Sequence, residues 1–96
     1  MAQTVQLALG TTAATSSTMV VATGAEMVIG IYADAGQQLS QAGNAFACTL
    51  VQVTPGADNQ IAILDSSNPT TIVKGPNSFK VLRPGAAVPI GVFSEV

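Results

Sequence analysis

Apolar and polar residues alternate in short runs along this chain, and turn-forming residues separate the runs. In residues 4–9, TVQLAL, the alternation predicts that Val5, Leu7 and Leu9 share one face of a strand. In residues 26–34, EMVIGIYAD, apolar side chains occupy both sets of alternating positions. The first pattern is typical of a strand with one buried face, and the second of a strand that is covered on both faces.

Turn residues divide the sequence into runs that are too short for typical helices. Pro55 with Gly56, and Asn68 with Pro69, stand between runs that are rich in Val and Ile. The polar stretch at residues 35–45 predicts a long loop or a single helical turn. The whole pattern predicts about eight strands, at residues 4–9, 18–22, 26–34, 46–53, 60–65, 70–74, 78–83 and 87–93.

Strands of this length and spacing predict an all-β fold, either a small β-sandwich of jelly-roll type or a barrel of about eight short antiparallel strands. We expect the sandwich, in which two sheets cover each other's inner faces. Residues 1–96 are expected to form a single β domain, with residues 1–18 as a possible extended N-terminal arm. The second apolar faces of residues 26–34 and 46–53 then need a further cover, which a neighbouring subunit can supply.

Charged residues make up only 8% of the chain, whereas an ordinary soluble domain carries about 25%. Thr, Ser, Gln and Asn supply the polar surface instead, and they pack against a partner without the cost of desolvating a charge. The net charge of −2 argues against a nucleic-acid partner, since such proteins neutralise phosphates with Lys and Arg. Either the surface is simply neutral and polar, or an assembly covers most of it.

The residues needed for most catalytic and metal sites are missing from the sequence. With no histidine and one cysteine, the chain cannot build a Ser-His-Asp triad, a Cys-His pair or an ordinary zinc site. Cys48 lies in an apolar run and is interpreted as a buried hydrophobic residue without a neighbouring cation. We expect no enzyme activity, no cofactor and no metal. The five carboxylates are interpreted as strand and turn residues: Glu26, Asp34, Asp58, Asp65 and Glu95.

Two of these carboxylates flank the run NQIAIL and are nominal ligands for calcium. The alternative interpretation is structural, and we prefer it. Asp58 is expected to close a turn with Asn59, and Asp65 to cap the DSSNP turn by hydrogen bonds from its side chain to the backbone.

All three cations of the chain, Lys74, Lys80 and Arg83, fall in one window, KGPNSFKVLRPG. Lys80 either protects an exposed strand edge against unwanted pairing or, with Lys74 and Arg83, contacts acidic groups on a neighbouring subunit. Arg83 is the favoured contact because its planar guanidinium suits bidentate pairing. On this interpretation, Arg83→Ala weakens assembly and leaves the fold intact.

The segments GPNSFKVLRP and VPIGVF resemble a pattern in small β-rich virion proteins of tailed bacteriophages, most like the capsid decoration, or cement, proteins. The resemblance covers about the last 25 residues of the chain. It implies a structural virion protein, often a trimer, that binds the major capsid protein on the outside of the head and stabilises it. Residues 1–18 would then be an arm that adds a strand to the capsid. The alternative is a tail- or fibre-associated β-sandwich that binds a host receptor or a carbohydrate.

The N-terminus has no basic segment followed by a long apolar one, and no apolar run approaches the roughly 20 residues that span a bilayer. We therefore expect a soluble product in the host cytoplasm that ends on the capsid exterior of a virion. Membranes and small-molecule substrates are not expected partners.

Overall fold

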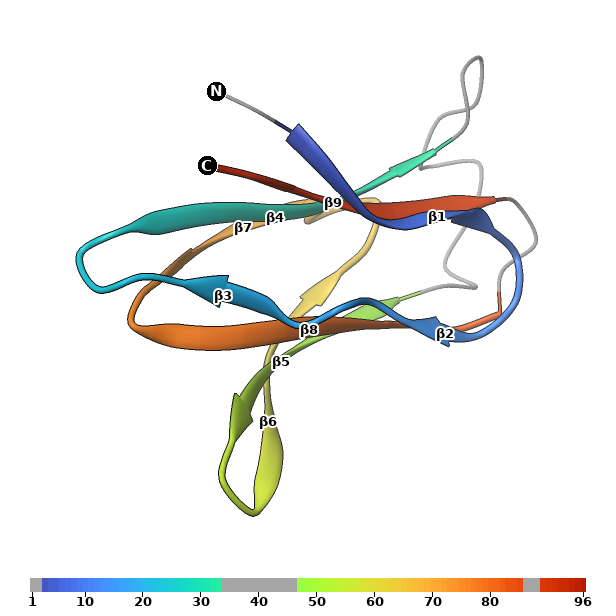
Figure 1. Cartoon of the computed structure of the whole chain (residues 1–96). Coiled ribbons are helices and arrows are strands. Elements are labelled where there is room, and N and C mark those ends of the chain that lie inside the picture. Colours follow the sequence, from blue (N-terminus) through green and yellow to red (C-terminus); the bar gives the residue numbers. More distant parts are fainter. Residues whose placement is uncertain (1–2, 34–46, 86–88) are drawn as a thin grey trace.

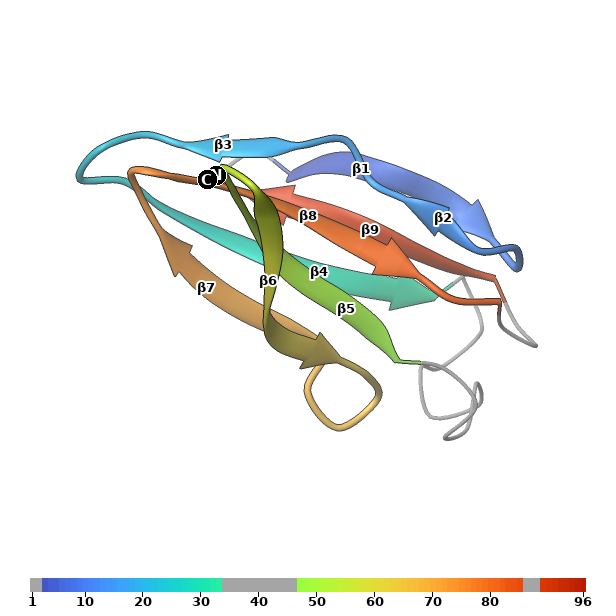
Figure 2. The ribbon, with the colours of Figure 1, turned by 90° about the horizontal axis from the view of Figure 1, so that it is seen from below.

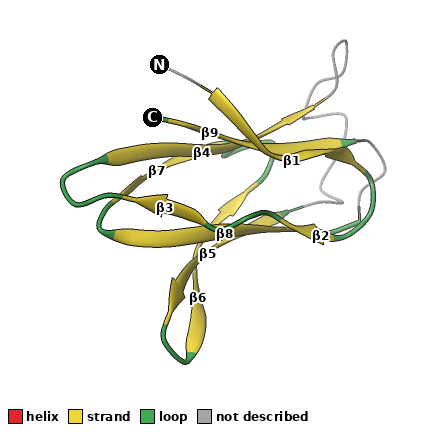
Figure 3. Cartoon of the chain, in the orientation of Figure 1, coloured by secondary structure: helices red, strands yellow, loops and turns green. Residues whose placement is uncertain are grey.

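Two antiparallel sheets pack face to face in the computed structural model, which describes residues 3–33, 47–85 and 89–96 (Figure 1). All the regular structure in these ranges is β-strand (Figure 3). The predicted all-β sandwich is confirmed.

The first sheet has four strands in the order β1-β9-β4-β7 and the second has five, in the order β2-β8-β5-β6 with β3 also on β8. The strands of the four-stranded sheet are β1 (Gln3–Gly10), β9 (Ile90–Glu95), β4 (Glu26–Ala33) and β7 (Thr70–Lys74). Those of the five-stranded sheet are β2 (Ala14–Thr15), β3 (Met19–Val21), β8 (Asn77–Arg83), β5 (Cys48–Thr54) and β6 (Ala57–Leu64). Seen from below, β4, β7 and β9 of one layer and β5 and β8 of the other run along nearly the same diagonal, as in aligned sheet packing, whereas β6 runs across it (Figure 2).

Each of the eight predicted strands has a counterpart in the structure. The ninth, β2, lies in a polar connection where no strand was predicted, and it is only two residues long. The possible arm at residues 1–18 is part of the sandwich from residue 3 onward, because β1 pairs with β9 and β2 with β8. The predicted loop or helical turn at residues 35–45 lies outside the described residues.

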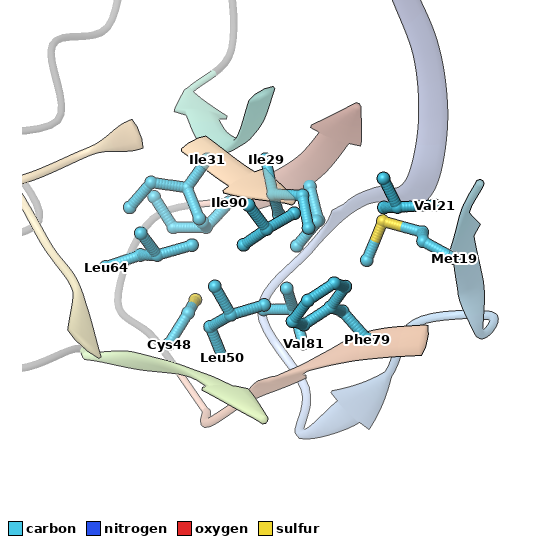
Figure 4. Packing of buried hydrophobic residues seen from close by; sticks show 12 residues of the cluster. Met19, Val21, Ile29, Ile31, Cys48, Leu50, Leu64, Phe79, Val81 and Ile90 are labelled. Carbon is cyan, nitrogen blue, oxygen red and sulfur yellow. The ribbon is translucent and has the colours of Figure 1, made fainter. Parts of the chain in front are cut away.

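The inner faces of the two sheets form one apolar core, as the alternation of residues predicts (Figure 4). Burying a side chain of this kind contributes roughly 1.5–3 kcal/mol. The core consists of Met19, Val21, Ile29, Ile31, Cys48, Leu50, Leu64, Val73, Phe79, Val81, Ile90 and Val92.

Strand β1 departs from the regular alternation. Val5 is opposite Phe93, whereas Leu7 is opposite Val92, and the register shifts between these two pairs. The shift turns Val5 outward, where it is 61% exposed, while Leu7 packs against the core. The expectation that Val5 and Leu7 share a face is therefore wrong, because a bulge has the effect of moving later residues to the other face.

Both predicted turn signals are found in the structure. Gly56 has a φ of +88°, which suits the third position of the tight turn between β5 and β6. The Asp65 side chain caps the next turn as predicted, since its Oδ1 accepts hydrogen bonds from the backbone N–H of Ser67 at 2.9 Å and of Asn68 at 3.0 Å. Asp58, by contrast, lies in β6 and closes no turn.

Candidate functional site

Arg83, the favoured contact, lies inside the domain. Its side chain is on the inner face of β8 with Phe79 and is 7% exposed. The guanidinium donates three hydrogen bonds to backbone carbonyls: Nε to Thr12 at 2.9 Å, and Nη1 to Ala8 at 2.7 Å and Ile90 at 2.8 Å. Arg83 thus joins β8 of one sheet to β1 and β9 of the other.

Gly10 makes room for this guanidinium. A Cβ at residue 10 would lie 2.7 Å from Nη2 of Arg83, so a larger residue would displace the guanidinium. The interpretation of Arg83 as an exposed contact that can be removed without harm to the fold is therefore corrected. The planar guanidinium, which was expected to pair with a carboxylate of a partner, donates its hydrogen bonds to carbonyls of the same chain.

Lys80 forms an ion pair on the outer face of the five-stranded sheet. Its Nζ lies 2.7 Å from Oδ2 of Asp58, and the two side chains are 28% and 37% exposed. Lys80 is opposite Val51, so the pair crosses β5 above that residue, which is buried. Strand β8 is paired on both sides, with β5 and with β2 and β3, and Lys80 therefore does not protect a sheet edge as one interpretation expected.

Lys74 ends the edge strand β7 on the opposite side of the molecule. It is exposed and lies opposite Glu26 on the outer face of the four-stranded sheet. The fold therefore separates the three cations that the sequence places in one window. A contact with a neighbouring subunit stays a prediction for Lys74 and Lys80.

A pair of aromatic rings lies on the outer face of the four-stranded sheet. Phe93 is opposite Gly30, and Tyr32 is opposite Gly91. A Cβ at Gly30 would lie 2.6 Å from the Phe93 ring, and one at Gly91 would clash with the Tyr32 ring. Each ring therefore lies down over a glycine of the neighbouring strand. The two rings meet edge to face, with centroids 6.4 Å apart and planes at 62°.

Two hollows lie on this sheet, and the aromatic pair lines one of them. One, of about 290 Å³, is lined by Gln3, Val5, Tyr32 and Phe93. The other, of about 180 Å³, is lined by Glu26, Met27, Val28, Ile72, Glu95 and Val96. We call the surface that joins them the outer apolar face, and it consists of Val5, Val28, Tyr32, Ile72, Phe93 and Val96.

Several side chains of the outer apolar face are largely exposed to solvent. Val5, Ile72 and Val96 are 61%, 62% and 66% exposed. Scattered exposed apolar residues are normal, but here Ile72 and Val96 line one hollow, and Val5 lines the other together with the aromatic pair. This arrangement is suited to binding another apolar surface.

The side chains of the described residues provide little other chemistry. No group of three or more metal-ligating residues occurs among residues 3–33, 47–85 and 89–96, and no helix in those ranges is long and apolar enough to cross a membrane. Cys48 is buried, as predicted, and burial raises the pKa of its thiol from 9.0 to about 11. The positive charge of Arg83 opposes this rise in pKa, so a cation does lie near Cys48, contrary to expectation.

Sequence reasoning identified apolar second faces on two strands but missed the aromatic pair. A signal for it is present, because Gly30-Ile31-Tyr32 and Gly91-Val92-Phe93 have the same spacing of glycine and aromatic residue. In an antiparallel pair of strands this spacing sets each ring opposite the other strand's glycine. The pairing of β4 with β9, which is not evident from either segment alone, was needed to see it.

No protein family, no curated protein and no solved structure matches this chain. These comparisons give no support to a phage origin.

Proposed function

We propose that the protein is a structural subunit without enzymatic activity, which binds other protein subunits in a large assembly. The outer apolar face is the observation that carries this proposal. A β-sandwich with so few charges, and with several exposed apolar residues on an outward sheet face, is better suited to a covered position than to a free one.

In its finer form the proposal is a decoration protein of a tailed-phage capsid, with the major capsid protein as its partner. The segments that resemble such proteins form the turn before β8, β8 itself and β9. These strands hold the domain together, since β8 is paired on both sides and β9 lies between β1 and β4. The resemblance therefore concerns the fold more than any contact surface.

Binding to undecorated, expanded phage heads tests this proposal. Purified protein should bind saturably at a fixed number of copies for each head and should raise the temperature at which heads lose their DNA. Heat-unfolded protein serves as the control for non-specific adsorption. Lack of both saturation and protection would contradict the decoration role.

The aromatic pair supports a second candidate, a carbohydrate-binding module of a tail or fibre. Tyr32 and Phe93 lie together beside the 290 Å³ hollow, and Gln3 adds an amide that can bond a sugar hydroxyl. Tyr32 is the only tyrosine and the chain has no tryptophan, so intrinsic fluorescence reports on this hollow alone. Titration with bacterial surface oligosaccharides should then change the fluorescence of Tyr32, and Phe93→Ala should abolish the change.

A further inference from the structure

We propose that the 180 Å³ hollow on the outer apolar face binds an arginine side chain of the partner protein. This inference rests on the proposed function, in which another protein subunit covers the outer apolar face. It adds the chemistry that this subunit presents at one point of the contact. The observation that carries it is a hollow with apolar walls and two carboxylates, those of Glu26 and Glu95.

The residues that line the hollow are neighbours on the outer face of the four-stranded sheet. Val28 on β4 is opposite Ile72 on β7 and, on its other side, opposite Glu95 on β9. Glu26 precedes Val28 by two residues on β4. Glu26 and Glu95 are therefore diagonal neighbours, and such residues lie about 7–8 Å apart, within reach of one long side chain. A single cationic group can contact both carboxylates.

The chain itself supplies little positive charge to this hollow. Arg83 bonds to backbone carbonyls inside the domain, and Lys80 pairs with a carboxylate of the other sheet. Lys74 is opposite Glu26 but forms no ion pair with it, and the residues opposite Glu95 on β1 and β4 are uncharged. A cation from another molecule is therefore attracted to the two carboxylates.

The form of the hollow favours an arginine side chain over other cations. Sites for whole small molecules commonly measure about 300–1,000 Å³, so a hollow of 180 Å³ suits a single side chain. A metal ion gains nothing from apolar walls, because it prefers a shell of oxygen ligands. The aliphatic part of an arginine packs on such walls, while its guanidinium has enough N–H donors for two carboxylates. Arginine is also enriched in protein interfaces, where lysine is depleted.

Amide chemical shifts of the purified protein test the site with small probes. We expect N-acetylarginine amide to shift the signals of Val28 and Ile72 saturably. N-acetylcitrulline amide has nearly the same shape without the charge, and it should bind about fivefold more weakly. High salt should weaken the arginine probe and leave the citrulline probe nearly unchanged. Equal binding of the two probes, or binding of neither, would overturn the proposal.

Removal of one carboxylate tests whether the charge lies where the structure has it. Glu95→Gln should weaken binding of the arginine probe about fivefold, as expected for the loss of one exposed ion pair. Asp65→Asn is the matched control, since it removes a carboxylate outside the hollow and keeps an Oδ1 atom to cap its turn. Equal weakening by both variants would mean that only net charge matters, and would overturn the proposal.

Removal of the nearby lysine should have the opposite effect. Lys74→Gln takes away the cation opposite Glu26, so the arginine probe should bind about twofold more tightly. Damage to the fold would weaken binding instead. Lys80→Gln changes the net charge equally on the other sheet and should leave binding unchanged. Weaker binding by a folded Lys74→Gln protein, with unchanged circular dichroism, would contradict the proposal.

Undecorated phage heads separate this inference from the proposed function. We expect Glu95→Gln to bind heads about fivefold more weakly than the unaltered chain does, and Asp65→Asn to bind them equally well. Saturable head binding that Glu95→Gln leaves unchanged would overturn the arginine contact and keep the decoration role. Selective binding of the arginine probe without any binding to heads would contradict the decoration role and still support an arginine contact with another subunit.

Discussion

Lys80 and Arg83 lie three residues apart on the same strand and have opposite surroundings. The Lys80 ammonium stays at the surface, where it meets one carboxylate that is itself partly exposed. The Arg83 guanidinium is buried at the end of the sandwich and meets three backbone carbonyls from residues that are 7 to 75 positions away. Strand alternation alone separates them, because odd and even positions of β8 point to opposite sides of the sheet.

The contrast between Lys80 and Arg83 shows which kind of cationic side chain a β-sandwich can bury. A guanidinium is planar, weakly hydrated and presents several N–H donors in a fixed plane, so it can bond carbonyls from several segments at once. An ammonium is compact and strongly hydrated, and burying it costs more. The segment KGPNSFKVLRPG therefore contains one buried arginine that links the two sheets and two lysines at the surface, and its three cations are not equivalent contacts.

The largest expected effect on stability comes from removing the buried guanidinium of Arg83. Arg83→Met keeps an apolar chain of similar length but leaves three carbonyls without their donor, and should lower the free energy of unfolding by about 3 kcal/mol. Lys80→Met is the control and should change it by less than about 1 kcal/mol. Urea unfolding of both variants provides the measurement. Equal effects would mean that Arg83 is no more structural than Lys80.

A second, smaller effect concerns the buried thiol near Arg83. Because burial raises the pKa of Cys48 from 9.0 to about 11, the folded chain keeps this proton at pH values where the unfolded chain loses it. The free energy of unfolding should then fall as the pH rises from 9 to about 11. Cys48→Ala should lack this part of the pH dependence, and urea unfolding at pH 8 and pH 10 would reveal the difference.

The pKa of the Cys48 thiol also distinguishes the electrostatic effects of Arg83 and Lys80. Arg83 lowers the pKa of Cys48 through its charge, so Arg83→Met should raise that pKa further, whereas Lys80→Met should leave it unchanged. Thiolate absorbance against pH measures both. If Arg83→Met does not fold, Arg83→Lys keeps a charge near the site, and an unshifted thiol pKa in that variant would support the same conclusion. A shift caused by Lys80→Met would contradict it.

The smallest effect is expected for the surface ion pair. Lys80→Ala or Asp58→Ala should each reduce the free energy of unfolding by at most about 1 kcal/mol, because both side chains are partly exposed and solvent screens their attraction. High salt should reduce this contribution further. A double-mutant cycle in urea measures the coupling, and a coupling that 1 M NaCl leaves unchanged would argue against a screened surface pair.

Most of the fold was predictable because the strands are short, alternate regularly and end at strong turn residues. The TTIVK strand and the cap by Asp65 are examples in which local chemistry determines local structure. The prediction of which side chains share a face of the sheet failed where the alternation is interrupted, as at Val5, because a bulge depends on the partner strand. The two-residue strand β2 was missed because two residues carry no period.

The candidate site was less predictable, because its parts come from strands that are distant in sequence. The outer apolar face combines residues from β1, β4, β7 and β9, and only the strand order brings them together. Arg83 was interpreted as a contact because charge in a sequence suggests exposure. Its carbonyl partners are main-chain atoms, and a sequence gives no sign of which main-chain atoms a side chain will meet.

The position of β9 has a consequence for how the domain is made. It is the last of the nine strands in chain order, yet it lies between β1 and β4 and pairs with both. During synthesis, β1 therefore stays without this neighbour until β9 has left the ribosome, after all the other strands of the two sheets. The four-stranded sheet should consequently close only once β9 has emerged, and nascent chains that stop before β9 should remain sensitive to protease.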